Sequence, residues 1–354
     1  MMIGRLLHYW LEKGSRIMTL CPGNNPLSFP LLTHLTSNPS LLLNVQRLSA
    51  GQEHFFQASS LTTCLQEGGL TIQALRHEIT DPGPVKPPSV LAIFPQSVSW
   101  TWTEDHPDNY SKEHLLAGRT LLERMLDDPE KRHDRWYNLC SAGTYFDTIQ
   151  TSRGSSHPTV GFSAGLFYLI ACLGRRCWLV METGVKDPIL DATFEGQLLT
   201  WEPEHDDQNL VHMSIGYRKH GLIMLYTICG IPIPVSDPSS PAKDSVTGAE
   251  GSGPRIRGLT MGSLGRLFRT SVDAPYLSFH STPLLTAAVE PTAEDAQLRI
   301  NVVGRFKAIY CTNRVAVNMW AIELLQKLWD LPDCGVHVTW LELLISKEWT
   351  FTFA

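Results

Sequence analysis

LLHYWLEKGSRIMTLCPGNNPLSFPLLTHLTSNPSLLLNVQRLSAGQEHFF, residues 6–56, decides the fold class. The stretch predicts a helix, a connection punctuated by Asn-Pro, and a second helix that opens at Asn38-Pro39. Apolar residues return at the spacing of one helix face in both halves, namely Leu6, Trp10 and Ile17, then Leu41, Leu42, Val45 and Leu48. Asn38 is a suitable N-cap, and Pro39 suits the first helical position because its missing N–H would be unpaired there. Two helices are therefore predicted to begin the chain.

The same periodicity continues along most of the sequence. It predicts helices at roughly 61–79, from Ser111 onward, and at roughly 133–150, 162–182, 188–200, 208–229 and 294–330. The last is predicted to break near Cys311–Asn313. Trp100–Trp102 is the best strand candidate, and a sheet would need several more strands. The predicted fold class is all-α: an irregular multi-helix array that forms one domain, residues 1–354.

Two segments interrupt the helical pattern. Residues 231–258 are rich in Pro, Ser and Gly, and they are predicted to form a long disordered loop. This loop is either a plain linker or a segment for modification or docking, with Ser236, Ser239 and Ser240 near prolines. Residues 81–109 are predicted to form a Pro-rich loop, because Asp81-Pro82-Gly83-Pro84 ends the preceding helix.

Composition narrows the function classes. A hydrophobic content of 43% with 18% charged residues fits a globular protein. The net charge is −6 and no strong basic run is present, so no direct contact with nucleic acid is expected. The eight cysteines include no C-x-x-C pair, which favours buried thiols in a reduced, intracellular setting. The longest apolar run, Val160–Leu173, is too short to span a bilayer, so a soluble protein without a membrane partner is expected.

One short motif could carry enzyme chemistry. Gly161-Phe162-Ser163-Ala164-Gly165 fits the G-x-S-x-G nucleophile elbow, in which a serine stands on a sharp turn between a strand and a helix. Candidate partners follow in the order acid then base: Asp187 or Asp191, then His205, His212 or His220. However, the preceding residues 151–160 are polar where a buried strand is needed, and Ser163 equally suits a helix N-cap. A serine esterase is therefore the alternative hypothesis, and a non-enzyme is preferred.

Metal and cofactor signals are weak. An acidic run, Glu202, Glu204, His205, Asp206 and Asp207, could attract a metal or could open a helix, where carboxylates are favoured by the helix dipole. The thirteen histidines show no H-E-x-x-H spacing, and no glycine-rich phosphate loop is present. No catalytic, cofactor-binding, metal or DNA-binding residue is predicted, and no cofactor is expected.

Several further blocks occur in a recognisable order. They are Glu113–Arg119 with Leu121-Leu122, Tyr145-Phe146-Asp147, Val160–Ser163 with Leu166-Phe167, Leu198-Leu199-x-Trp201-x-Pro203, Tyr217-Arg218, Pro283–Ala288, Arg299, Arg305, Leu324-Leu325-x-x-Leu328-Trp329 and Trp340-Leu341. Together with residues 6–56, they resemble the helical regulatory domain of fungal zinc-cluster transcription factors. The apolar positions are expected to be core residues, whereas Arg119 and Arg305 would fix helix ends or pair with carboxylates.

The resemblance implies a function. It implies a transcriptional regulator in the nucleus that controls a fungal metabolic or secondary-metabolite pathway. The binuclear zinc cluster of the family is missing here, so the expected mechanism is contact with another transcription factor or DNA-bound partner, or with a second copy as a homodimer. A small-molecule effector held between helices is a further expectation of the resemblance.

Overall fold

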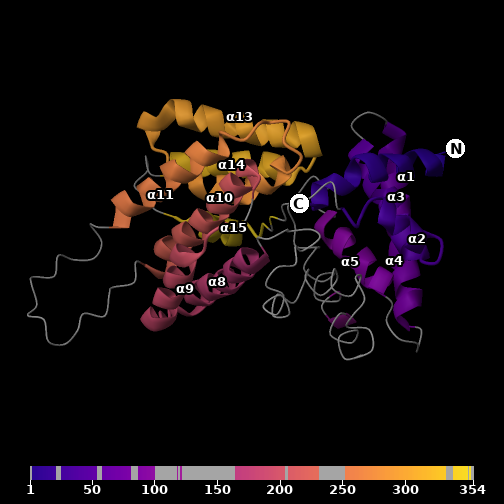
Figure 1. The fold of residues 1–354 in the computed structure, drawn as a ribbon, viewed down its shortest axis with the longest axis horizontal. Coiled ribbons are helices and arrows are strands. Elements are labelled where there is room, and N and C mark those ends of the chain that lie inside the picture. Colours follow the sequence, from indigo (N-terminus) through magenta and orange to yellow (C-terminus); the bar gives the residue numbers. More distant parts are fainter. Residues whose placement is uncertain are drawn as a thin grey trace, which may run out of the picture. The chain divides into compact units, whose positions relative to one another are not determined.

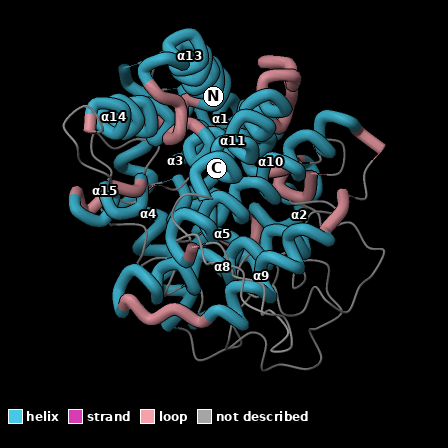
Figure 2. The backbone as a smooth tube through the Cα atoms, turned by 90° about the vertical axis from the view of Figure 1, so that its left-hand side faces the viewer, coloured by secondary structure: helices cyan, strands magenta, loops and turns pink. Residues whose placement is uncertain are grey.

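The computed structural model describes residues 2–20, 25–53, 58–80, 87–99, 118, 120–121, 164–203, 206–230, 252–331, 338–349 and 351. Within these ranges every regular element is a helix and there is no strand (Figure 2). The all-α prediction is confirmed. The strand candidate Trp100–Trp102 and the helices predicted from Ser111 and at 133–150 lie outside the described residues.

The chain separates into two compact units, whereas the sequence predicted a single domain. Unit 1 comprises residues 1–161, 307–320 and 344–354, and unit 2 comprises residues 162–306 and 321–343. Helices α13 (Ala296–Asn313) and α14 (Val317–Asp330) therefore contribute residues to both.

Unit 1 is built around α3. Its elements are α1 (Met2–Glu12), η1 (Gly14–Met18), η3 (Phe29–Leu31), α2 (Leu32–Leu35), α3 (Pro39–Glu53), α4 (Ala58–Thr80) and α5 (Pro87–Ser99) (Figure 1). Helix α3 packs against α1, α4 and α5, and it is buried on nearly every side. A helix enclosed in this way must satisfy its polar side chains internally. Accordingly, the Asn44 amide donates to the Ala92 carbonyl at 2.6 Å, and the buried Arg47 donates to the Gln96 amide oxygen at 3.3 Å.

The N-terminus of α3 is capped from another helix. Glu78 of α4 accepts the Ser40 backbone N–H at 3.2 Å, and its other carboxylate oxygen accepts the Ser40 hydroxyl at 2.8 Å and the Ser89 hydroxyl at 2.6 Å. A carboxylate is favoured at this end of a helix. The side chain of Asn38, the predicted cap, instead donates from its amide to the His34 carbonyl at 2.8 Å. The start of α3 at Pro39 agrees with the prediction.

Unit 2 is built around α10. Its elements are α8 (Ala164–Thr183), α9 (Pro188–Thr200), α10 (Gln208–Met224), the π-helical turn η7 (Leu225–Cys229), α11 (Ser252–Leu267), η8 (Leu277–His280), α12 (Ser281–Ala287), η9 (Ala293–Asp295), parts of α13 and α14, and the start of α15 (Trp340–Ser346). Helix α10 packs against α8, α9, α11 and α12. The fully buried side chains include Leu166, Leu173, Leu198, Met213, Leu225 and Phe306.

Two predicted loops are partly helical. Residues 87–99 of the expected Pro-rich loop form α5, which contains Pro95 in its interior. Residues 252–258 of the expected disordered loop form the first turns of α11. In both cases burial of apolar side chains such as Val90, Ile93 and Ile256 outweighs the low helix propensity of Pro and Gly. Residues 231–251, with all three candidate serines, lie outside the described residues.

Other sequence predictions agree with the structure. The helices at 188–200 and 208–229 are present, and the break predicted near Cys311–Asn313 occurs where α13 ends at Asn313 and α14 starts at Val317. Arg305 fixes a helix end, as one of its two predicted roles: its guanidinium donates to the carbonyls of Thr270 at 3.0 Å and Phe268 at 3.1 Å, just after α11. Arg119 lies outside the described residues.

Candidate functional site

The connection between α8 and α9 exposes large apolar side chains. We call this surface the α8–α9 tip. It consists of Trp178, Leu179, Val185, Ile189 and Leu190. Ile189 is 77% exposed and Trp178 is 53% exposed, although most tryptophans are largely buried in folded proteins. Five such residues fall within thirteen positions of the chain, and a concentration of exposed apolar side chains typically marks a contact with another molecule.

A buried ion pair holds the tip in place. Arg176 of α8 and Asp191 of α9 have side chains that are 6% and 4% exposed, and two hydrogen bonds of 2.9 Å and 3.3 Å join them. The same guanidinium donates to the Val185 carbonyl at 3.2 Å, so it also fixes the connecting loop. A buried charge is tolerated only when paired and hydrogen-bonded. The pairing therefore sets the geometry of the tip.

The loop itself ends one helix and starts the next. Gly184 adopts a φ of 69° and donates to the Val180 carbonyl at 2.7 Å, which is the left-handed conformation that favours glycine at a helix C-terminus. Asp187 caps α9 by accepting the Leu190 N–H at 3.1 Å, and Pro188 follows at the first helical position. The exposed apolar residues thus stand on a well-defined turn.

Two thiols lie beside the ion pair. Cys177 of α8 is hydrogen-bonded to Cys229 at the end of η7, and its sulfur is 4.0 Å from the Met224 carbonyl oxygen. This hydrogen bond lowers the pKa of Cys229, with smaller contributions from the charges of Arg176 and Lys186. The same bond, together with burial, raises the pKa of Cys177. Cys172 and Cys177 were both predicted to be buried thiols; the prediction is confirmed for Cys177, whereas Cys172 is partly exposed.

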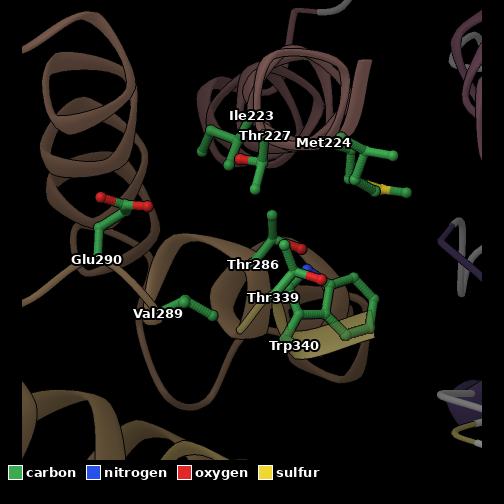
Figure 3. A pocket seen from close by; sticks show the side chains of 9 residues that line it. Ile223, Met224, Thr227, Thr286, Val289, Glu290, Thr339 and Trp340 are labelled. Carbon is green, nitrogen blue, oxygen red and sulfur yellow. The ribbon is translucent and has the colours of Figure 1, made fainter. Parts of the chain in front are cut away.

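A small cavity lies between α10, α12 and the start of α15. Figure 3 shows Ile223 and Thr227 on one side, Trp340 and Thr286 opposite them, and Glu290 at the edge. The cavity has a volume of about 20 Å³. A cavity of about 10–15 Å³ accommodates one water molecule. Burial raises the pKa of Glu290. The cavity can hold ordered water, and it is too small for a drug-sized effector.

The residues of the hydrolase hypothesis do not come together where the structure describes them. Asp187 caps α9, and Asp191 is paired with Arg176. The Nδ1 atom of His220 is 2.7 Å from the Thr286 hydroxyl, and His212 is next to Arg266. Gly161, Phe162, Ser163 and His205 lie outside the described residues, as does the segment that would supply the preceding strand.

The acidic run opens a helix. Asp207 caps α10 by accepting the Asn209 N–H at 2.8 Å, whereas Glu204 lies outside the described residues. No group of three or more metal-ligating side chains occurs in the part of the chain that the structure describes. Among the helices in that part, none is long and apolar enough to cross a bilayer.

The residues of the tip were not predicted to form a functional site. A signal was available in residues 188–200, where Asp191, Phe194 and Leu198 share the buried stripe and Ile189, Leu190 and Leu199 fall outside it. Apolar residues on a second face of a short helix indicate a further contact. A scan against family models and searches of curated proteins and of solved structures found no match to this chain.

Proposed function

We propose that this protein is a nuclear regulator of transcription that acts through protein–protein contacts made by the α8–α9 tip. The observation that carries the proposal is the group of five exposed large apolar side chains beside the buried Arg176–Asp191 pair, which fixes the connecting loop. A rigid apolar surface loses little conformational entropy on binding, so it is well suited to a specific partner. Tryptophan at the centre of such a surface is a frequent hot spot.

The resemblance described above supplies the biological setting. It supports a role in a fungal metabolic or secondary-metabolite pathway, with a DNA-bound transcription factor or a second copy of the chain as the partner. The protein would then reach promoters through that partner, without direct contact to DNA. The cavity at Glu290 is too small to hold such an effector.

The experiment compares the tip with a second exposed apolar site in the same unit. Ile189→Ser alters the tip, and Ile300→Ser alters α13, where Ile300 is 63% exposed. Each change should shift the free energy of unfolding by less than about 0.5 kcal/mol, because exposed positions contribute little to stability.

A deletion strain is complemented with wild type or either variant, and nuclear localisation and transcripts are measured. We expect wild type and Ile300→Ser to restore the transcripts of the deleted strain and Ile189→Ser to fail. Unchanged transcripts after deletion would refute the proposed function, and full restoration by Ile189→Ser would refute the role of the tip.

The serine esterase remains the alternative, on the strength of the G-x-S-x-G motif alone. It predicts turnover of an activated ester such as p-nitrophenyl acetate, lost in Ser163→Ala. Turnover that survives in that variant, or no turnover by wild type, excludes this mechanism.

A further inference from the structure

Basic side chains gather where α10 faces α11 in unit 2. The two helices pack against each other and lie side by side in Figure 1. We call the group the basic seam. It consists of His212 and Lys219 of α10, Arg266 of α11, and Arg269 just beyond α11. His212 and Lys219 are seven residues apart and therefore share one helix face, as do positions 262, 266 and 269 of the other element.

Two close contacts join these groups across the two helices. The Arg266 guanidinium is 3.5 Å from Nδ1 of His212. One turn earlier on α11, the Lys219 ammonium lies against the backbone at Gly262, in the space that a Cβ would occupy. The ammonium can occupy this space because residue 262 carries no side chain. The seam is a built arrangement and not a set of independent surface lysines and arginines.

The positive charges are not compensated within the described residues. Burial lowers the pKa of Lys219, and the charges of Arg266 and Arg218 lower it further. Burial also lowers the pKa of His212, with added effects of Arg266 and Arg269. No ion pair in the described part of the chain includes any residue of the seam. Arg218, the chain neighbour of Lys219, has a buried Nε without a hydrogen-bond partner in the described residues, and its NH1 group donates to the Trp201 carbonyl at 2.8 Å.

We propose that the basic seam binds a phosphoryl group, either as a free phosphate ester or as the headgroup of a lipid. Like charges held together in a partly buried site destabilise a fold unless an anion compensates them. A phosphoryl group carries up to two negative charges and three acceptor oxygens, which suit several guanidinium and ammonium donors at once. This proposal is independent of the α8–α9 tip and of any role in transcription.

The seam favours a compact ligand over a nucleic acid. Its cations lie at one helix–helix boundary, whereas a duplex is contacted along a stripe of many phosphates. The chain also carries a net charge of −6, which opposes non-specific association with a polyanion.

The test titrates the full chain with sodium pyrophosphate at constant ionic strength, with chloride as the reference, by isothermal titration calorimetry. Lys219→Met and Arg266→Gln should each weaken binding about tenfold, which corresponds to about 1.4 kcal/mol. Neither variant should unfold the protein, because each removes a repelled charge. Both should raise the melting temperature without anion and reduce the increase that pyrophosphate produces.

A matched glycine pair separates seam geometry from helix propensity. Gly262→Ala and Gly265→Ala both favour the helix by roughly 1 kcal/mol, which corresponds to about a fivefold change in the folding equilibrium. Only the first change displaces the Lys219 ammonium, because nothing lies within 4 Å of a Cβ at residue 265. We expect weaker pyrophosphate binding in Gly262→Ala and unchanged binding in Gly265→Ala.

Each outcome is decisive. Saturable binding of pyrophosphate or inorganic phosphate that depends on Lys219 supports a soluble ligand. Binding only to phosphatidylcholine vesicles that contain phosphatidic acid, lost in Lys219→Met, supports a lipid headgroup. Equal binding by wild type and both charge variants, no binding of any probe, or tighter binding of a DNA duplex would overturn the proposal.

Discussion

The Arg176–Asp191 pair offers the sharpest test of how unit 2 is held together. Arg176→Met keeps most of the aliphatic chain and removes the charge, which leaves the Asp191 carboxylate buried without its partner. The wild-type pair has side chains 6% and 4% exposed, two mutual hydrogen bonds and a third bond to the Val185 carbonyl. Loss of one member of such a pair typically costs about 3–5 kcal/mol. This is a large share of the roughly 5–15 kcal/mol that stabilises a typical protein.

Urea unfolding followed by circular dichroism measures the loss, and amide hydrogen exchange assigns it to α8 and α9. The control is Lys327→Met, which removes a cation from the exposed Lys327–Glu323 pair, with side chains 43% and 49% exposed. That change should cost no more than about 0.5 kcal/mol.

The double variant Arg176→Met/Asp191→Leu completes the cycle. It should be more stable than Arg176→Met alone, because no unpaired charge remains buried. A loss below about 1 kcal/mol in Arg176→Met, as for a surface pair, would refute the reasoning. The single variants Arg176→Met and Asp191→Leu each lower the free energy of unfolding. If the double variant loses the sum of these two amounts, the reasoning is refuted as well.

Three further predictions concern other buried groups. Burial lowers the pKa of His220 to about 4 and that of His280 to about 3, where Arg305 adds to the effect. In the unfolded chain these histidines bind protons near pH 6.5, whereas in the folded chain they stay neutral to a lower pH. The folded state is therefore fully stable above pH 6.5 and loses up to about 1.4 kcal/mol per pH unit for each histidine as the pH falls toward 4 and 3. A free energy of unfolding that stays constant from pH 7 to 4.5 in urea titrations would contradict this. Glu78→Ala should lower the free energy of unfolding by about 1–3 kcal/mol, because a helix N–H and two serine hydroxyls lose their acceptor. A change below about 0.5 kcal/mol, the size of a surface effect, would exclude a capping role. Iodoacetamide should label Cys229 before Cys177, because the thiol hydrogen bond lowers the pKa of the first and raises that of the second; mass spectrometry that finds the reverse order would reject the assignment.

Local sequence patterns were sufficient to predict where many of the helices lie. The helices at 188–200 and 208–229, and the interruption after Asn313, could be predicted because a helix is held by bonds between residues four apart and its apolar face repeats every three or four positions. The same rules failed at 87–99. There the prolines favour a loop, while burial of Val90 and Ile93 stabilises a helix.

The sequence by itself determined that the described chain folds as helices, and only the tertiary structure decided which side chains those helices bury, pair or expose. Arg176 and Asp191 are fifteen residues apart, and Arg266 and His212 are fifty-four residues apart. Neither pairing has a local pattern, because it depends on how separate helices pack. The exposure of Ile189 likewise depends on how the described helices pack, and the apolar character of the residue alone would have predicted burial.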